Sequence, residues 1–193
     1  MTFASRYIAG WLRVSATLDV AAVDHAVKVL GEARERDATV WTAGNGGGSA
    51  LASHLTIGLT VNTRRAGGRP FRSSSLGADA AALSAASNDF GAENALRAIF
   101  ECNARKGDIL CVISVSGKSP NIVHALRSST ELGITSIALV GDDRSPIAQL
   151  ANHTILLGSV EPGIAEDVAS AVVHSIYCTF MYEHSDTLPG EFR

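Results

Sequence analysis

Apolar and polar residues follow two different rhythms along the chain. Up to about residue 36, apolar side chains recur every three or four positions, at Ile8, Leu12, Val20, Val23, Val27 and Leu30. That spacing is typical of one face of a helix. Further on, short apolar runs alternate with helical stretches, and we expect strands at residues 39–43, 73–76, 109–114, 136–140 and 153–157. Strands separated by helices predict a parallel sheet covered by helices on both faces.

The helices can be bounded from their capping residues. Asp19 or Asp24 is a candidate cap for a second helix within the first 36 residues, Asp79 caps another, and Pro120 suits a first helical turn. Residues 64–72 and 88–91 contain glycine, proline or asparagine and are expected to form a loop and a turn. The remaining helices are expected at residues 49–60, 92–105, 146–150 and 165–183.

The chain is predicted to be one domain, because no repeat, linker or low-complexity tract divides its 193 residues. We divide it into an N-terminal helical segment (1–36), an α/β core (37–183) and a loose tail (184–193). Charged residues make up 18% of the chain, below the typical ~25%. The apolar stripe of the first segment needs a partner surface, so we expect a homo-oligomer.

The net charge and the hydropathy of the chain limit which classes of function are expected. The net charge of −3 supplies no basic stripe, so direct binding to nucleic acid or to acidic membranes is not expected. No stretch approaches ~18 uninterrupted apolar residues, and the first twelve residues do not follow the pattern of a signal peptide. These features predict a cytoplasmic protein.

Two segments share the design that binds phosphate groups. Residues 44–49 and 114–119 each follow an apolar strand, contain small residues and precede a helix. Glycines let backbone N–H groups approach an anion, and a helix N-terminus adds partial positive charge. In a parallel sheet both loops would lie at the carboxyl ends of strands, where ligands bind. A glycine run can also be only a tight turn, but two such runs in equivalent places favour a phosphate site.

A nucleotide cofactor is not expected. Neither loop fits the GxxxxGK[ST] or the GxGxxG pattern. Lys118 is followed by Ser119, but the earlier glycine of a mononucleotide loop is absent.

Three separated motifs carry a resemblance to a known family. Residues 44–47 (GNGG), 88–91 (NDFG) and 113–119 (ISVSGKS) resemble the landmarks of the sugar isomerase (SIS) domain family. Their order and spacing most resemble its bacterial phosphoheptose isomerases, over about residues 20–183. The resemblance implies a flavodoxin-like sheet of five strands and a homotetramer with active sites between subunits. It also implies a sugar phosphate, such as sedoheptulose 7-phosphate, as the ligand.

The resemblance also assigns roles to individual residues. It implies that Ser114, Ser116 and Ser119 hold the phosphate, that Val115 offers only its backbone, and that further substrate contacts come from Asn45, Gly46, Gly47, Asn88 and Asp89. His174 matches a position that serves as catalytic acid/base and metal ligand, and His54 matches a metal ligand. Glu166 stands where the heptose isomerases usually have Gln, and it is a candidate for catalysis and metal binding. A zinc site formed by His54, Glu166 and His174 is one expectation; ordinary helix histidines and an acid at a helix start are the alternatives.

One position departs from the family. Its catalytic Glu stands four residues after His54, where this chain has Gly58. Aldose–ketose isomerisation moves a proton between two carbons through an enediol, and losing the base would cost ~10²–10⁴ in rate. The missing side chain is expected to leave room for a glutamate at position 58. Two functions therefore remain open: an aldose–ketose isomerase, with Glu166 in place of the missing base, or a non-catalytic phosphosugar sensor or tetrameric scaffold.

Overall fold

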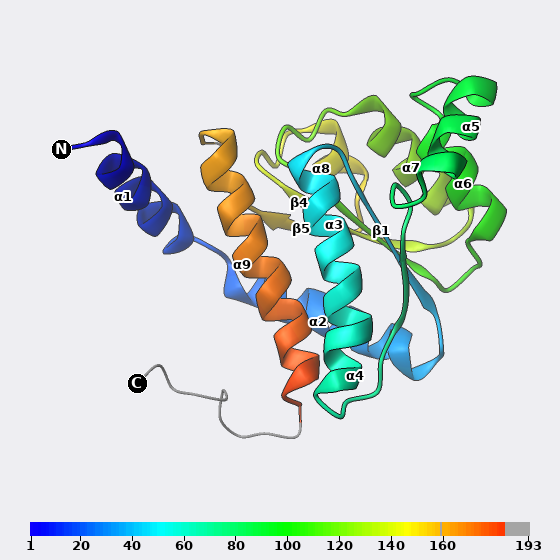
Figure 1. Cartoon of the computed structure of the whole chain (residues 1–193), viewed down its shortest axis with the longest axis horizontal. Helices are drawn as coiled ribbons and strands as arrows, with labels where there is room; N and C mark the ends of the chain where they lie inside the picture. Colours follow the sequence, from blue (N-terminus) through cyan, green and yellow to red (C-terminus); the bar gives the residue numbers. More distant parts are fainter. Residues whose placement is uncertain (159, 184–193) are drawn as a thin grey trace.

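A computed structural model describes residues 1–158 and 160–183 (Figure 1). Five parallel strands form one sheet in the order β2-β1-β3-β4-β5, the order of flavodoxin-like folds. The strands are β1 (Thr39–Gly44), β2 (Arg72–Ser75), β3 (Ile109–Ser114), β4 (Thr135–Val140) and β5 (His153–Leu156). The predicted fold class and number of strands are confirmed.

Helices connect successive strands and cover both faces of the sheet. They are α1 (Phe3–Ser15), α2 (Val20–Glu35), α3 (Gly47–Ile57), η1 (Gly58–Asn62), α4 (Thr63–Arg65), α5 (Ala80–Phe90), α6 (Ala95–Asn103), α7 (Pro120–Glu131), α8 (Pro146–Leu150) and α9 (Pro162–Met181). Asp19 caps α2 and Asp79 caps α5, each through its side chain, and Pro120 opens α7 as expected.

Each face of the sheet has its own core, because alternate residues of a strand point to opposite faces. Val40, Cys111 and Ile113 pack with α2, α3 and α9 on one face. Ala43, Leu110 and Val112 pack with α6, α7 and α8 on the other. All six residues of β3 are buried, as suits the central strand of a covered parallel sheet.

The two helices of the N-terminal segment differ in their surroundings. Val23, Ala26 and Leu30 of α2 are buried in the core beside the sheet, so the apolar stripe of α2 has its partner within the chain. Only α1 projects from the body, beside α9 (Figure 1). The division of the chain after residue 36 stays a prediction, and the predicted loose tail lies outside the described residues.

Two other predictions are corrected. The helical backbone that starts at Gly47 runs on through Arg65, and β2 begins at Arg72, so the expected loop at 64–72 is shortened to residues 66–71. A π-helical stretch, η1, interrupts it from Gly58 to Asn62, with Thr63 Oγ1 donating to the Gly58 carbonyl at 2.9 Å. The NDFG segment ends α5, and only Gly91, with φ 80°, stands beyond the helix.

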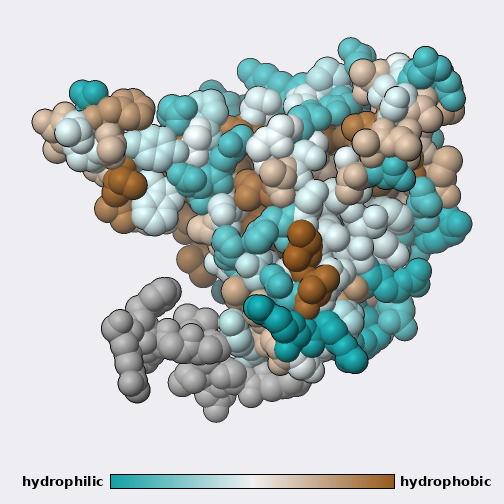
Figure 2. Space-filling view, in the orientation of Figure 1, coloured by the Kyte–Doolittle hydropathy of each residue, from teal (hydrophilic) through white to brown (hydrophobic). Residues whose placement is uncertain are grey.

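No helix in the described residues is long and apolar enough to span a bilayer. Exposed apolar residues gather at two places (Figure 2). One is α1, where Phe3, Ile8 and Leu12 are 74%, 53% and 57% exposed. The other lies over the end of α3, at Ile57 and Val61.

Candidate functional site

The two glycine- and serine-rich loops lie side by side at one edge of the sheet. β1 and β3 are neighbours, with Gly44 opposite Ile113, so the loops after them meet at the carboxyl ends of both strands. Gly44 and Gly48 must lack side chains, since a Cβ on Gly44 would strike the Gly48 backbone and one on Gly48 would lie 2.6 Å from the Ile113 carbonyl oxygen. Close backbone packing thus brings the N-termini of α3 and α7 to one place.

A pair of asparagines joins the loops. Asn45 donates from Nδ2 to Oδ1 of Asn121 at 2.9 Å, and Asn121 returns the same hydrogen bond at 2.9 Å. Sequence reasoning missed Asn121, although its place one residue after Pro120 in the first turn of α7 is a signal for a residue that faces the loop. The reciprocal amide pair holds the two glycine- and serine-rich loops together.

The loops enclose a cavity of about 450 Å³. Its walls include six predicted site residues: Asn45, Ser114, Val115, Ser116, Ser119 and Glu166. Lys118 also lines it and adds a positive charge, while Asp142 adds a carboxylate. Backbone N–H groups at the starts of α3 and α7, hydroxyls and one ammonium group suit a phosphate group.

A second cavity, of about 650 Å³, lies at the opposite edge of the sheet. Arg36 and Arg105 line it, but both already donate to backbone carbonyls, Arg36 to Gly107 and Arg105 to Asn103 and Ala104. Cations near helix C-termini stabilise the helix dipole. Ligands of open parallel sheets bind at the carboxyl ends of the strands, so we assign the site to the smaller cavity.

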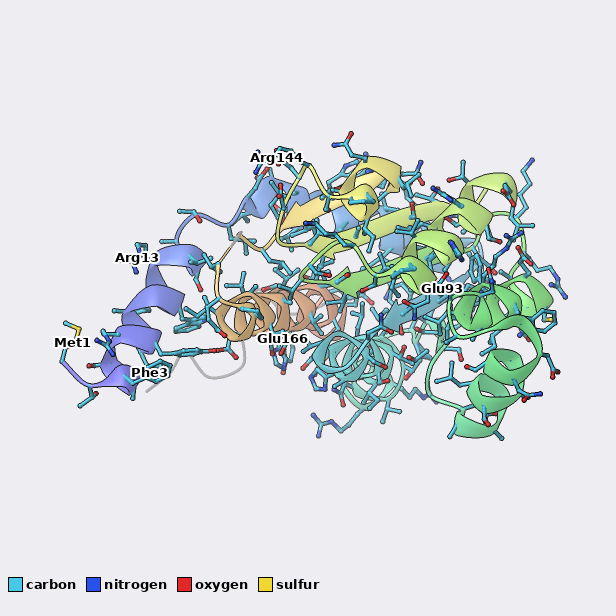
Figure 3. All side chains as sticks on the ribbon, turned by 90° about the horizontal axis from the view of Figure 1, so that it is seen from above. Met1, Phe3, Arg13, Glu93, Arg144 and Glu166 are labelled. Carbon is cyan, nitrogen blue, oxygen red and sulfur yellow. The ribbon has the colours of Figure 1, made fainter. Side chains whose placement is uncertain are left out.

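Glu166 lies against the first of the two loops. Its Oε1 and Oε2 are both 2.5 Å from the point where a Gly47 side chain would begin, so Gly47 is required for this contact. Figure 3 shows Glu166 on α9, beside α3. A carboxylate at the N-terminus of a helix is stabilised by the helix dipole. Glu166 therefore belongs to the loop end of the site.

The two predicted histidines meet further along the same pair of helices. His54 Nε2 on α3 lies 3.1 Å from His174 Nε2 on α9. Burial, and then the neighbouring His174, lowers the pKa of His54. His54 is thus neutral at physiological pH and can accept a proton. The sequence could not show this pairing, since 120 positions separate the two residues.

The predicted zinc ligands do not converge. His54 and His174 are in contact, but Glu166 is two turns away along α9, against Gly47. Within residues 1–158 and 160–183, no three His, Cys, Asp or Glu side chains are grouped as a metal site. An open zinc site has three protein ligands, so the two imidazoles alone do not fit one, and no chemical step is assigned to zinc.

The space expected beside Gly58 is filled. A Cβ on Gly58 would collide with the ring of Tyr177 at Cγ and Cδ1, and Tyr177 is only 7% exposed. The Tyr177 hydroxyl lies 3.4 Å from His54 Nε2. The expectation that position 58 has room for a glutamate is therefore wrong while Tyr177 is present.

Asn88 and Asp89 are not brought into the cavity. Both are exposed on the last turn of α5, where Asn88 Nδ2 donates to Asp89 Oδ1 at 2.9 Å, and neither lines the cavity of the two loops. Within one chain, the substrate contacts implied by resemblance are thus divided between the loops and a separate surface on α5.

Comparisons with known proteins agree with this fold. The family model named SIS domain, which describes the sequences of that family, matches residues 3–141 of this chain. The chain is 35% identical over 137 residues to a phosphoheptose isomerase of Vibrio vulnificus, covering 71% of each protein. It is 34% identical over 130 residues to the phosphoheptose isomerase of Chlorobaculum parvum; the match covers 67% of this chain but only 62% of that relative's length.

A solved structure has the same fold. The phosphoheptose isomerase GmhA from Neisseria gonorrhoeae superposes with a TM-score of 0.84 at 22% sequence identity, covering 92% of this chain and 96% of that one. The predicted resemblance is therefore confirmed. With its five-stranded sheet, its paired loops and a domain match over most of its length, the chain belongs to the SIS domain family.

Proposed function

We propose that the protein is a sugar-phosphate isomerase that interconverts a ketose phosphate and an aldose phosphate, with sedoheptulose 7-phosphate as the first candidate substrate. One observation carries the proposal: a cavity of about 450 Å³ between two loops opens beside α3 and α9, which bring His54 and His174 together. A phosphate anchor and an imidazole base are the two parts that such a reaction requires.

The spacing of the two parts suits a sugar phosphate. His54 stands seven residues after Gly47 on one helix, or about 10 Å along the axis at 1.5 Å per residue. An open-chain sugar of six or seven carbons has a similar length. Its phosphate would occupy the loops while the carbonyl end reaches the histidines, and Glu166 would accept hydrogen bonds from hydroxyls between them.

The chemistry belongs to the imidazoles. His174 takes the proton from the carbon beside the carbonyl, the C–H electron pair becomes the double bond of an enediolate, and the proton returns to the neighbouring carbon. A hydroxyl proton moves between the two oxygens as the carbonyl re-forms. General-base catalysis contributes about 10²–10⁴-fold to such a step. Zinc binding stays a prediction, since it requires ligands beyond the two imidazoles.

A non-catalytic role is the second candidate. Gly58 carries no base, and Tyr177 occupies its place, an arrangement that favours a phosphosugar sensor or scaffold. In either role, the exposed apolar residues of α1 support assembly into the expected tetramer. The expected cytoplasmic location also stays a prediction.

Incubation with sedoheptulose 7-phosphate in deuterated water, followed by proton NMR, distinguishes the two roles. We expect deuterium at the carbon beside the carbonyl and formation of the aldose phosphate. His174→Ala should abolish both while keeping the rise in melting temperature that the sugar phosphate causes. Binding without exchange in the parent protein would contradict the isomerase and favour the sensor.

A further inference from the structure

Tyr177 stands where two independent features of the site meet. Its ring fills the volume that any side chain at position 58 would need. Its hydroxyl lies 3.4 Å from His54 Nε2, the same nitrogen that lies 3.1 Å from His174 Nε2. The Tyr177 side chain therefore excludes a residue at position 58 and also contacts the histidine pair.

The ring also forms one wall of the pair. Its centroid lies 5.7 Å from that of His54 and 5.4 Å from that of His174, at interplanar angles of 71° and 64°. The two imidazoles themselves are 5.0 Å apart at 73°. Edge-to-face contacts of this kind are favourable and directional. The three rings thus hold one another in a fixed arrangement between α3 and α9.

The backbone of α3 accommodates this arrangement. Gly58 keeps helical angles, φ −58° and ψ −51°, so its glycine is not needed for the backbone conformation. It is needed because the Tyr177 ring packs directly on its Cα. The π-helical stretch begins at the same residue, and such stretches occur often at functional sites.

We propose that Tyr177 is a positioning residue for the His54–His174 pair, and that it acts through a hydrogen bond from its hydroxyl to His54 Nε2. This inference rests on the proposed isomerase function. With Nε2 of His54 as the acceptor, His54 carries its proton on Nδ1. His174 then donates from its own Nε2 to the same nitrogen. Which ring nitrogen of a histidine carries the proton is set by the hydrogen bond that its other ring nitrogen makes.

The consequence concerns the nitrogen that takes the substrate proton. When Nε2 of His174 is a donor, Nδ1 of His174 keeps its lone pair. In the described part of the chain, no hydrogen bond occupies that Nδ1, and His174 is exposed. Tyr177 therefore selects, through His54, the nitrogen of His174 that acts as the base. The Tyr177 hydroxyl thus orients His54, although position 58 has no carboxylate that could do so.

Tyr177→Phe tests the proposal, because it keeps the ring against Gly58 and removes only the hydroxyl. Nitrogen-15 NMR of the imidazoles reports tautomers directly. We expect His54 to shift from the Nδ1–H toward the Nε2–H tautomer, with kcat falling about 10- to 100-fold and KM little changed. Tyr7→Phe is the matched control: it removes a hydroxyl that donates to Asp167 at 2.8 Å, away from the pair.

The test of Tyr177 can fail or succeed independently of the test of isomerase activity. An inactive parent protein refutes the isomerase, yet the tautomer comparison still tests the role of Tyr177. An unchanged His54 tautomer in Tyr177→Phe overturns the proposal, whatever the activity. If Tyr177→Phe does not fold, Gly58→Ala with Tyr177→Leu removes the hydroxyl while refilling the space, and the same shift is expected.

Discussion

Gly58 illustrates how a single residue is explained by its neighbour in space. Alone in a helix, glycine is less stable than alanine by about 1 kcal/mol, and the helical angles of Gly58 would suit alanine. The Tyr177 ring reverses this preference, because a methyl group would collide with it. Glycine at position 58 and tyrosine at position 177 are therefore a matched pair.

The pair predicts a change of sign in a double-mutant cycle. Gly58→Ala alone should lower the free energy of unfolding by about 1–3 kcal/mol, the range for overpacking, and Gly58→Glu by more. In a Tyr177→Ala background, Gly58→Ala should instead be neutral or stabilising. Urea unfolding of the four proteins measures the coupling, and equal effects in both backgrounds would contradict the steric explanation.

At the scale of elements, hydrogen bonds and backbone packing hold the β1–α3 loop against the β3–α7 loop. The Asn45–Asn121 amide pair spans the loops, and Ser114 is buried at the end of β3. The hydroxyls of Ser116 and Ser119, in contrast, line the cavity without being buried. They are available to a ligand.

Removing these two hydroxyls should weaken sugar-phosphate binding. Each hydrogen bond to a charged group contributes about 1.5–3 kcal/mol, so Ser116→Ala with Ser119→Ala should raise the Kd at least tenfold. Titration calorimetry with sedoheptulose 7-phosphate measures the change. Ser84→Ala, an exposed serine on α5, is the control. Parent-like affinity in the double variant would show that the phosphate binds elsewhere.

A second histidine pair links α2 to β5. His25 Nε2 lies 3.1 Å from His153 Nδ1, in a small cavity that also contains Lys28, Glu32 and Arg36. Burial, followed by the neighbouring His25, lowers the pKa of His153 below its ordinary value of 6.5. The folded protein therefore holds His153 neutral where the unfolded chain would already bind a proton.

This shift predicts a loss of stability in mild acid. Below pH 6.5 the unfolded state binds more protons than the folded state, so the free energy of unfolding falls as the pH decreases toward the pKa of folded His153. The effect fades as the pH rises past 6.5, because the unfolded chain then loses its proton as well. Urea unfolding between pH 5 and 8 should show a shallower slope for His153→Gln than for the parent. The same slope in both proteins would contradict the prediction.

At the scale of the whole molecule, α1 is a helix whose apolar residues remain exposed to solvent. It projects beside α9 (Figures 1 and 3), held by the Tyr7–Asp167 hydrogen bond and by packing of Gly10 on Ile164. Phe3, at its outer end, is 74% exposed. Apolar surface of this kind on a small domain marks an interaction site.

We predict that α1 forms an interface between copies of the chain. Light scattering at micromolar concentration should give a mass near four times 20.1 kDa. Phe3→Ser with Leu12→Ser should shift the protein to smaller species, whereas Arg6→Gln, on the same helix, should not. A parent protein of only 20.1 kDa would contradict the oligomer.

Some features followed from the sequence alone because their causes are local. The central strand Ile109–Ser114 and the short helix Pro146–Leu150 have the predicted bounds, since an apolar run or a first-turn proline determines them without help from distant residues. The positions of the two glycine- and serine-rich loops, each between a strand and a helix, were predicted for the same reason. Order and spacing of three short motifs were enough to indicate the family.

Other features depended on contacts between residues far apart in the chain. Burial of the apolar stripe of α2 depends on its contacts with the sheet and with α9, and the pairing of His54 with His174 depends on α9 packing beside α3. From the sequence, Gly58 was expected to leave space beside the helix. In the folded protein that space is filled by Tyr177, which lies 119 positions away in the chain. The sequence thus determined which groups the site could use, and packing decided which of them meet, because side-chain contacts between helices depend on how the helices are arranged around the sheet.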